Sequence, residues 1–285
     1  MTEIPMRPLR LILLFVPTLL GLAVVHGASA QTLMPHRAVY DLALLETSDD
    51  SDIDGLTGRW VFEFSGSACE GYTLKSRIVM RFETADGPNL VDQQVTSFES
   101  SDSKTLRFTT KSFVEEQLES EVEGTAKLED GNTVVGYEQP EKVEKTFAAT
   151  LFPTAQLREL LEKANAGQRF YETAIFDGTE FTDKAIQVSV VVGDPKPVEN
   201  DDPEKKALGA LAKDTFRPVT AAYFNGREDE KEQGEETSDY NVSFKLHEGG
   251  LQRDMVIRYA DYSMTAKLVD LSVFEPESCE PEKKN

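Results

Sequence analysis

A two-residue alternation of apolar and polar side chains runs along most of this chain and constrains its fold more than any other feature. The longest example spans residues 72–83. Its apolar face carries Tyr72, Leu74, Ser76, Ile78, Met80 and Phe82. The opposite face is mostly charged or polar. This period places one face of a strand against a dry core and the other face in water, as in antiparallel sheets. The chain is therefore predicted to be mainly β.

Runs of this kind recur on both sides of a single predicted helix. We expect about fourteen strands, with turn sequences such as Asp86-Gly87 between them. The helix is expected to begin after Pro153, with Thr154 as its capping residue, and to stop at Gly167. Because the strands come in long runs and do not alternate with helices, we expect one antiparallel sheet in one domain.

Residues 1–30 are predicted to be a signal peptide for export. Basic residues precede a mainly apolar run at 11–25, and the small residues at 28–30 match a cleavage pattern. As a helix, this run would cover about 22 Å, which is less than the ~30 Å hydrocarbon core of a membrane. We therefore expect cleavage after Ala30, no transmembrane anchor, and a single β-rich domain over residues 31–285.

The chain is strongly acidic, with 51 aspartates and glutamates against 30 lysines and arginines and a formal net charge of −21. A protein of this charge is repelled by phosphate backbones, so we expect no nucleic-acid partner. Many of the acids gather at residues 194–214 and 225–239, which break the strand pattern. We interpret both segments as solvated excursions, and residues 204–214 have the pattern of a short surface helix.

Residues with the chemistry of an active site or a metal site are scarce and do not group. His36 and His247 are the two histidines outside the expected signal peptide, and neither belongs to a zinc or nucleophile motif. Residues 50–55 open like a calcium loop, but Val61 stands where that loop needs a glutamate. We interpret these residues as a polar turn. The sequence therefore predicts no catalytic residue, no metal and no cofactor.

Cys69 and Cys279 are the two cysteines of the chain. An even count in an exported protein favours one disulfide, and the alternative is two unpaired thiols. A bond between them would hold the C-terminal segment against the early strands and bring the two ends of the sheet together.

The apolar face of the predicted sheet is rich in aromatic side chains. The candidate ligand-facing residues are Trp60, Phe62, Phe64 and Tyr72. One helix is too short to cover so long a sheet, so either the sheet closes on itself or an apolar groove stays open. One interpretation of these aromatics is a packed core. The other is a curved sheet whose cavity takes an acyl chain or an apolar segment of a partner.

Several short motifs occur in a recognisable order. They are HRAVYDL at 36–42, GRWVF at 58–62, CEGY at 69–72, LFPT at 151–154, YF at 223–224 and YADYSM at 259–264, followed by Cys279. With this order and this cysteine placement, the chain resembles the EipB family of cell-envelope-integrity proteins, which are periplasmic proteins of alphaproteobacteria.

The resemblance implies a spiral or open-barrel-like β domain in which Cys69 and Cys279 are bonded. It also implies a periplasmic, non-enzymatic role in envelope integrity, with no catalytic residues to transfer to this chain. The architecture is similar to that of outer-membrane lipoprotein carriers. We therefore expect the partner to be an envelope protein or an acyl chain of a lipid or lipoprotein on the concave face. The alternative is a hydrolase or lyase of envelope glycans that uses a carboxylate pair.

Overall fold

The computed structural model describes residues 33–225, 237–275 and Cys279. The signal peptide expected at 1–30, with its cleavage point, lies outside the described residues. Most of the acidic excursion at 225–239 lies outside them as well.

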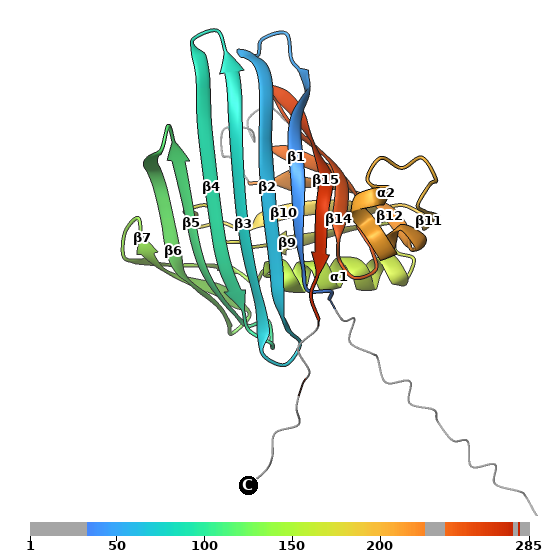
Figure 1. Cartoon of the computed structure of the whole chain (residues 1–285). Coiled ribbons are helices and arrows are strands. Elements are labelled where there is room, and N and C mark those ends of the chain that lie inside the picture. The colour runs from blue at the N-terminus through green and yellow to red at the C-terminus, as the bar shows by residue number, and fades with distance from the viewer. Residues whose placement is uncertain (1–32, 226–236, 276–278, 280–285) are drawn as a thin grey trace, which may run out of the picture. The chain divides into compact units, whose positions relative to one another are not determined.

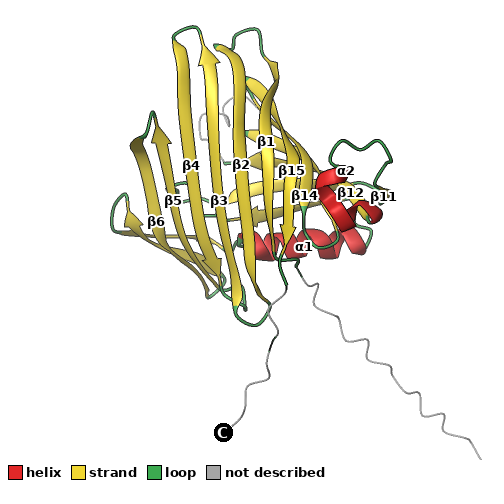
Figure 2. Ribbon diagram, viewed as in Figure 1, coloured by secondary structure: helices red, strands yellow, loops and turns green. Residues whose placement is uncertain are grey.

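The described residues form one antiparallel sheet of fifteen strands with three helical segments (Figures 1 and 2). The strands are β1 (His36–Thr47), β2 (Ile53–Ser67), β3 (Gly71–Thr84), β4 (Gly87–Glu99), β5 (Thr105–Val114), β6 (Gln117–Glu129), β7 (Asn132–Gln139), β8 (Val143–Ala148), β9 (Phe170–Ile175), β10 (Ile186–Val192), β11 (Lys196–Pro197), β12 (Thr215–Phe224), β13 (Tyr240–His247), β14 (Gln252–Tyr259) and β15 (Tyr262–Val273). The helical segments are α1 (Pro153–Asn165), α2 (Lys205–Leu208) and the 3-10 helix η1 (Gly209–Lys213). The predicted mainly β, antiparallel fold is confirmed.

The two ends of the described chain meet in the middle of the sheet. β1 and β15 pair antiparallel, with His36 opposite Val273 and Thr47 opposite Tyr262. The edges of the sheet are β8 and β9, which come from the middle of the sequence. A bond between Cys69, in the turn from β2 to β3, and the segment after β15 therefore strengthens a central seam and does not close the sheet.

The sheet is curled (Figure 1), and an isolated bridge links the segment after β8 to the β9 edge. Leu151, just after β8, forms an isolated bridge with Ile175 at the end of β9. Leu151 N donates to Ala174 O at 2.8 Å, and Phe176 N donates to Leu151 O at 3.0 Å. The sheet is not closed into a barrel, but this bridge lets its concave face enclose an interior.

The interior is packed at two places. The larger cluster of buried apolar side chains joins β1 and β2 to α1 and to the second half of the sheet, from β9 to β15. The smaller cluster lies under β5, β6 and β7. It consists of Leu106, Phe108, Val122, Ala126, Val135, Tyr137, Phe152 and Phe176.

Helix α1 lies across one end of this interior (Figure 2). It ends as predicted, followed by Gly167 in the left-handed conformation with φ of 76°. Its start differs from the prediction: Pro153 is the first helical residue, so Thr154 falls inside the first turn and makes no side-chain cap. The buried Glu99 of β4 caps the helix instead, accepting hydrogen bonds from Thr154 N at 2.7 Å and Ala155 N at 3.0 Å. A cap from so distant a residue leaves no signal in the local sequence.

The excursion at 194–214 contains α2 and η1. The prediction that it is solvated is wrong at its centre. Asp202 and Glu204 are 9% and 2% exposed, and both pair with the fully buried Arg253 of β14. The Arg253 Nη1 atom lies 3.0 Å from Asp202 Oδ2 and 2.8 Å from Glu204 Oε2. Lys245 Nζ lies 3.1 Å from Asp202 Oδ2, and Arg253 Nε donates to His247 Nε2 at 2.9 Å. We refer to these five residues as the charge cluster.

The charge cluster fastens the excursion to the sheet. Pairing between β14 and β15 stops at Met255 and Ala266. Just beyond that point, Glu204 Oε1 accepts hydrogen bonds from Asp254 N at 3.1 Å and Leu268 N at 2.7 Å. The carboxylate thus satisfies two backbone donors that the ladder leaves unpaired, which is a strong reason for a buried charge to stay there.

Candidate functional site

A cavity of about 550 Å³ opens inside the curled sheet, and we refer to it as the central cavity. Its walls come from β2, β3 and β4 on one side and from β12, β13 and β14 on the other, with the start of α1 and the end of β9 between them. Most of its lining side chains are aromatic or aliphatic. The volume falls within the ~300–1,000 Å³ range of sites that bind small molecules.

The four aromatic residues singled out from the sequence fall into two groups. Trp60 and Phe62 line the central cavity. Phe64 lines an adjoining space of about 160 Å³ next to α1. Tyr72 packs in the core, stacked on Phe64 with ring centroids 4.9 Å apart and with the Arg158 guanidinium 5.2 Å from its ring. Trp60 and Phe62 therefore face the central cavity, and Tyr72 packs behind Phe64.

A row of tyrosines follows the wall opposite Trp60. Tyr223 and Tyr240 stack with centroids 4.5 Å apart, Tyr240 and Tyr259 lie 5.7 Å apart, and Tyr259 and Tyr262 lie 4.9 Å apart. The first three line the central cavity. Burial, with the nearby Asp177 carboxylate, raises the pKa of Tyr223 to about 12, so its phenol stays neutral at physiological pH.

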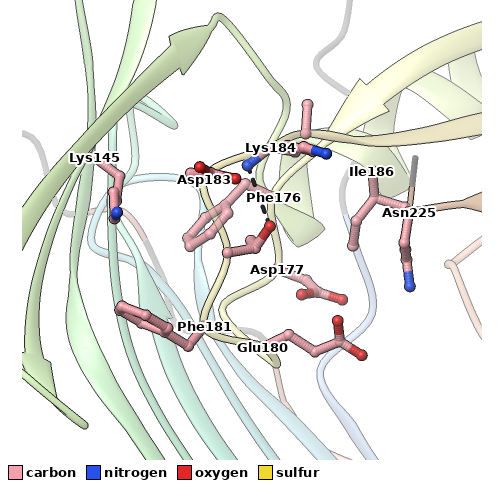
Figure 3. Close-up of a pocket in the computed structure, with 11 residues that line it drawn as sticks. Lys145, Phe176, Asp177, Glu180, Phe181, Asp183, Lys184, Ile186 and Asn225 are labelled. Carbon is pink, nitrogen blue, oxygen red and sulfur yellow. Dashed lines mark hydrogen bonds between the residues drawn. The ribbon is translucent and has the colours of Figure 1, made fainter. Parts of the chain in front are cut away.

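Three acidic residues also line the central cavity, and we call Asp177, Glu180 and Asp239 the cavity carboxylates. Asp177 Oδ1 accepts hydrogen bonds from Thr179 N at 3.0 Å and Thr179 Oγ1 at 2.8 Å, and burial raises the pKa of this carboxyl. Asp239 Oδ2 accepts from Asn225 N at 2.6 Å. In Figure 3 the side chains of Asp177 and Glu180 extend to the side of their loop away from Lys145.

The loop at 176–185 carries two of these acids and lies between the sheet edges. Thr110 Oγ1 of β5 donates to Gly178 O at 3.0 Å, and Tyr137 OH of β7 donates to Thr182 O at 2.9 Å. Gly178 has φ of 74°, and a Cβ there would lie 2.4 Å from Phe108, so only glycine fits this turn. The loop also borders a second space of about 420 Å³, which shares Asp177, Glu180 and Asn225 with the central cavity (Figure 3). The loop is therefore anchored at both ends of its span.

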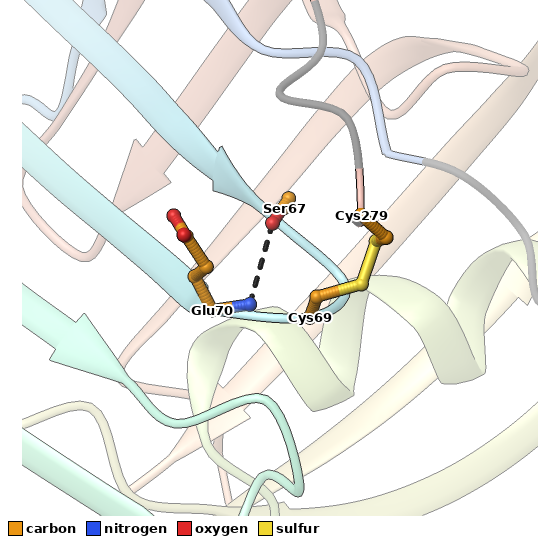
Figure 4. Close-up of a disulfide and its surroundings, with 4 residues drawn as sticks. All are labelled: Ser67, Cys69, Glu70 and Cys279. Carbon is orange, nitrogen blue, oxygen red and sulfur yellow. Dashed lines mark hydrogen bonds between the residues drawn. A yellow bond between two sulfur atoms is a disulfide. The ribbon is translucent and has the colours of Figure 1, made fainter. Parts of the chain in front are cut away.

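The predicted disulfide is present. Cys69 and Cys279 are bonded, with Cα atoms 5.8 Å apart (Figure 4). The turn that carries Cys69 is shaped by Ser67, whose Oγ accepts a hydrogen bond from Glu70 N at 3.3 Å. Neither cysteine lines the central cavity.

A model of the EipB-like family matches residues 27–275. The chain belongs to the EipB-like family. It is 47% identical over 250 residues to the cell envelope integrity protein EipB of Brucella abortus (strain 2308), and the match covers 87% of each chain. The family resemblance seen in the sequence is confirmed.

A crystal structure of a β-barrel-like protein of Brucella abortus, with a domain of unknown function, is similar to this EipB-like chain. The TM-score is 0.79 at 45% sequence identity, and the match covers 85% of this chain and 99% of that one. The open, barrel-like sheet is thus shared with a crystallographically determined protein.

The two histidines in the described part of this EipB-like protein are both buried side chains. His36 is 3% exposed, its Nδ1 lies 2.7 Å from Met34 O, and burial lowers its pKa. His247 belongs to the charge cluster. Asp50 ends the turn after β1, and Ile53, Asp54 and Gly55 already belong to β2, so the segment connects two strands as expected. Within the described ranges, no group of three or more histidine, cysteine or acidic side chains is arranged to hold a metal ion. No helix in the described part of the chain is long and apolar enough to cross a membrane.

Sequence reasoning missed the polar end of the central cavity. Asp177-Gly178 is recognisable only as a turn, because its position in the cavity depends on contacts with Thr110 and Tyr137, far away in the sequence. Tyr223 does occur in a motif that carries the family resemblance. Stacking with Tyr240 requires the pairing of β12 with β13, in which these two tyrosines are directly opposite.

Proposed function

We propose that this EipB-like protein supports cell-envelope integrity from the periplasm, without catalysing a reaction, by holding an acyl chain of a lipid or lipoprotein in the central cavity. The observation that carries the proposal is the cavity itself, about 550 Å³ in volume and lined mostly by aromatic and aliphatic side chains. An apolar segment of an envelope protein is the other candidate occupant.

The family supports the role and the compartment. The relative that is 47% identical is named a cell envelope integrity protein. The N-terminal segment of this chain has the pattern of a signal peptide, and the disulfide suits an oxidising compartment. Together these observations favour a protein that works in the periplasm.

The local contacts of two of the three cavity carboxylates do not favour the glycan hydrolase or lyase. Such an enzyme needs two carboxylates that flank the bond to be cleaved, one of them free to give a proton. Asp177 accepts two hydrogen bonds from Thr179, and Asp239 accepts one from the backbone of Asn225. These contacts give both acids a structural role in turns.

The test compares two neighbouring residues of β3 that lie on opposite faces. Ile78 lines the central cavity, and Val79 alternates to the other face. Ile78→Trp should fill part of the cavity, and Val79→Trp is the matched control on the outside. Each protein is purified from the periplasm of its native host, and its extract is examined by mass spectrometry for lipids and co-purified proteins.

We expect bound lipid with the wild type and with V79W, and several-fold less with I78W. In cells that lack the native gene, V79W should restore resistance to detergent and I78W should not. Equal lipid content in all three proteins, or none in the wild type, would contradict the proposal. A stoichiometric envelope protein in place of lipid would favour the other occupant.

A further inference from the structure

The central cavity continues into the space of about 160 Å³ next to α1, which we call the side space. The two share a stretch of wall that includes Phe62, Leu74 and Phe244. The other end of the central cavity is lined by Tyr259 and Glu180, and both of these residues are exposed. None of the described residues that line the side space is exposed. The cavity is therefore open to solvent at its tyrosine end and closed at its α1 end.

The strands run along the cavity from its open end to its closed end. On β13 the lining passes from Tyr240 through Val242 to Phe244, and of these three Phe244 alone also lines the side space. On β2, Phe62 lines both spaces, and Phe64 lines the side space but not the central cavity. Tyr240 and Phe244 are four positions apart, which is about 13 Å along a strand. An extended hydrocarbon chain advances about 1.2 Å per bond, as an extended backbone with three bonds per residue does, so the central cavity holds about ten carbons.

The back of the side space is apolar and contains one small residue. Val190, Val219, Ala221 and Leu160 are buried there, and none of them lines the central cavity. Val190 of β10 and Ala221 of β12 are directly opposite each other in the sheet. The short side chain of Ala221 leaves room that a larger side chain would fill. A hydrocarbon end that enters this space gains contact with apolar surface that is already shielded from water.

One polar group at the side space distinguishes a hydrocarbon from a polar occupant. Tyr171 lines the side space, and its buried hydroxyl has no hydrogen-bond partner among the described residues. Burial raises the pKa of this phenol, so the hydroxyl is neutral at physiological pH. A polar group of a ligand would use this donor, whereas a hydrocarbon end would not.

We propose that the side space receives the end of a long acyl chain, and that Ala221 at its back sets the longest chain that the protein holds. The chain follows the strands from the tyrosine end to α1, with about ten carbons in the central cavity and the remainder in the side space. This inference rests on the proposed function, because it names the length class of the acyl chain that the same cavity takes.

The test uses alkylphosphocholines that share one head group and carry octyl, decyl, dodecyl, tetradecyl or hexadecyl tails. Each is kept below its micelle concentration. Trp60 lines the central cavity and is the only tryptophan of the chain, so its fluorescence detects every probe that enters. Each methylene that becomes buried should tighten binding about fourfold. In the wild type we expect this gain to continue beyond decyl, at least as far as tetradecyl.

Two neighbouring alanines of β12 provide a matched pair of variants. Ala221→Leu fills the back of the side space, and Ala222→Leu adds the same group to the next residue, which alternates to the other face of the strand. A221L should bind octyl and decyl probes as the wild type does, and tetradecyl and hexadecyl probes at least tenfold more weakly. A222L should follow the wild type over the whole series. The unchanged binding of short tails shows that A221L is folded.

Two further variants act on the same space in other ways. Val219→Ala enlarges it and should strengthen binding of the hexadecyl probe relative to the dodecyl probe, so the proposal stays testable even if A221L does not fold. Tyr171→Phe removes the unpaired hydroxyl and should bind the tetradecyl probe as tightly as the wild type or more tightly.

The outcomes separate this inference from the proposed function. If A221L binds probes of every length with the wild-type affinities, the chain does not reach the side space, and acyl binding in the central cavity alone remains. Weaker tetradecyl binding by Y171F would place a polar group at the hydroxyl and would also overturn the inference. If no probe changes the fluorescence of Trp60 in the wild type, the proposed function itself fails.

Discussion

Acidic side chains gather in two regions of the molecule, the charge cluster and the central cavity, and their surroundings differ. In the charge cluster the carboxylates are almost fully buried, and Arg253 and Lys245 compensate them at distances of 2.8–3.1 Å. In the central cavity the carboxylates face an open space of about 550 Å³ whose described lining contains no basic residue. The charge cluster therefore holds the fold together through compensated buried charges, whereas the cavity carboxylates lie beside open space.

The largest change in stability is expected when the central cation of the charge cluster is removed. Arg253→Met leaves Asp202 and Glu204 buried without their partner, which should lower the free energy of unfolding by about 3–5 kcal/mol. Arg258→Met, an exposed arginine of the same strand, is the control and should stay within about 0.5 kcal/mol of the wild type. Urea unfolding followed by circular dichroism measures both. If R253M unfolds at the same urea concentration as R258M, the cluster does not stabilise the fold.

The second prediction concerns the pH dependence of the charge cluster. Burial and the adjacent Arg253 lower the pKa of His247 from 6.5 to about 4, and the hydrogen bond from Arg253 requires Nε2 to be unprotonated. The unfolded chain therefore binds this proton more readily than the folded one. Stability from this residue is present above pH 6.5 and is lost as the pH falls towards 4, by up to about 3 kcal/mol.

The measurement is the melting temperature of the wild type and of His247→Gln between pH 4 and pH 7. Glutamine keeps an acceptor for Arg253 but does not titrate in this range. The wild type should lose several degrees more than H247Q as the pH falls. The lowered carboxyl pKa of Asp202 and Asp254 matters only at the acid end of this window, where both proteins share it. Parallel pH profiles would show that His247 is not the titrating group.

The two regions also differ in how far they could be predicted. The alternation around Trp60 and Phe62 is a local pattern, so it predicts correctly that both side chains face inward. The acidic composition at 194–214 predicts solvation, and for Asp202 and Glu204 that is wrong, because Arg253 lies about fifty residues further along the chain. Burial of a charge depends on a partner that tertiary structure supplies, and composition contains no record of it.

The strand order is another feature that local sequence patterns do not predict. The antiparallel sheet follows from the periodicity of the strands, which each segment carries by itself. The pairing of β1 with β15, and the position of the edges at β8 and β9, depend on contacts across the whole chain. The cavity carboxylates were missed for this reason, since the loop that carries two of them is placed by β5 and β7.

The third prediction tests whether the junction of β1 and β15 can be weakened without a loss of ligand binding in the central cavity. Cys69→Ser removes the bond that ties the turn after β2 to the segment after β15. We expect a loss of about 2–3 kcal/mol, or roughly 5–10 °C in melting temperature. Because neither cysteine lines the central cavity, the lipid that co-purifies with the protein should be retained at temperatures where the variant is folded. If the folded variant no longer binds the lipid, the disulfide also contributes to the shape of the central cavity.

The smallest change in stability is expected for a substitution of Asp177, the cavity carboxylate whose ionised form is disfavoured by burial. Burial raises the pKa of Asp177, so the folded chain holds this proton more tightly than the unfolded chain, and ionisation at neutral pH costs stability. Asp177→Asn keeps the acceptor for Thr179 and removes that cost, so its stability should equal the wild-type value or exceed it slightly, within about 0.5 kcal/mol. Asp202→Asn, the same substitution inside the charge cluster, should destabilise the fold, because it removes the carboxylate that pairs with Arg253 and Lys245. If D177N destabilised the protein as much as D202N does, the cavity carboxylates would be part of the structural framework, and the contrast between the two regions would disappear.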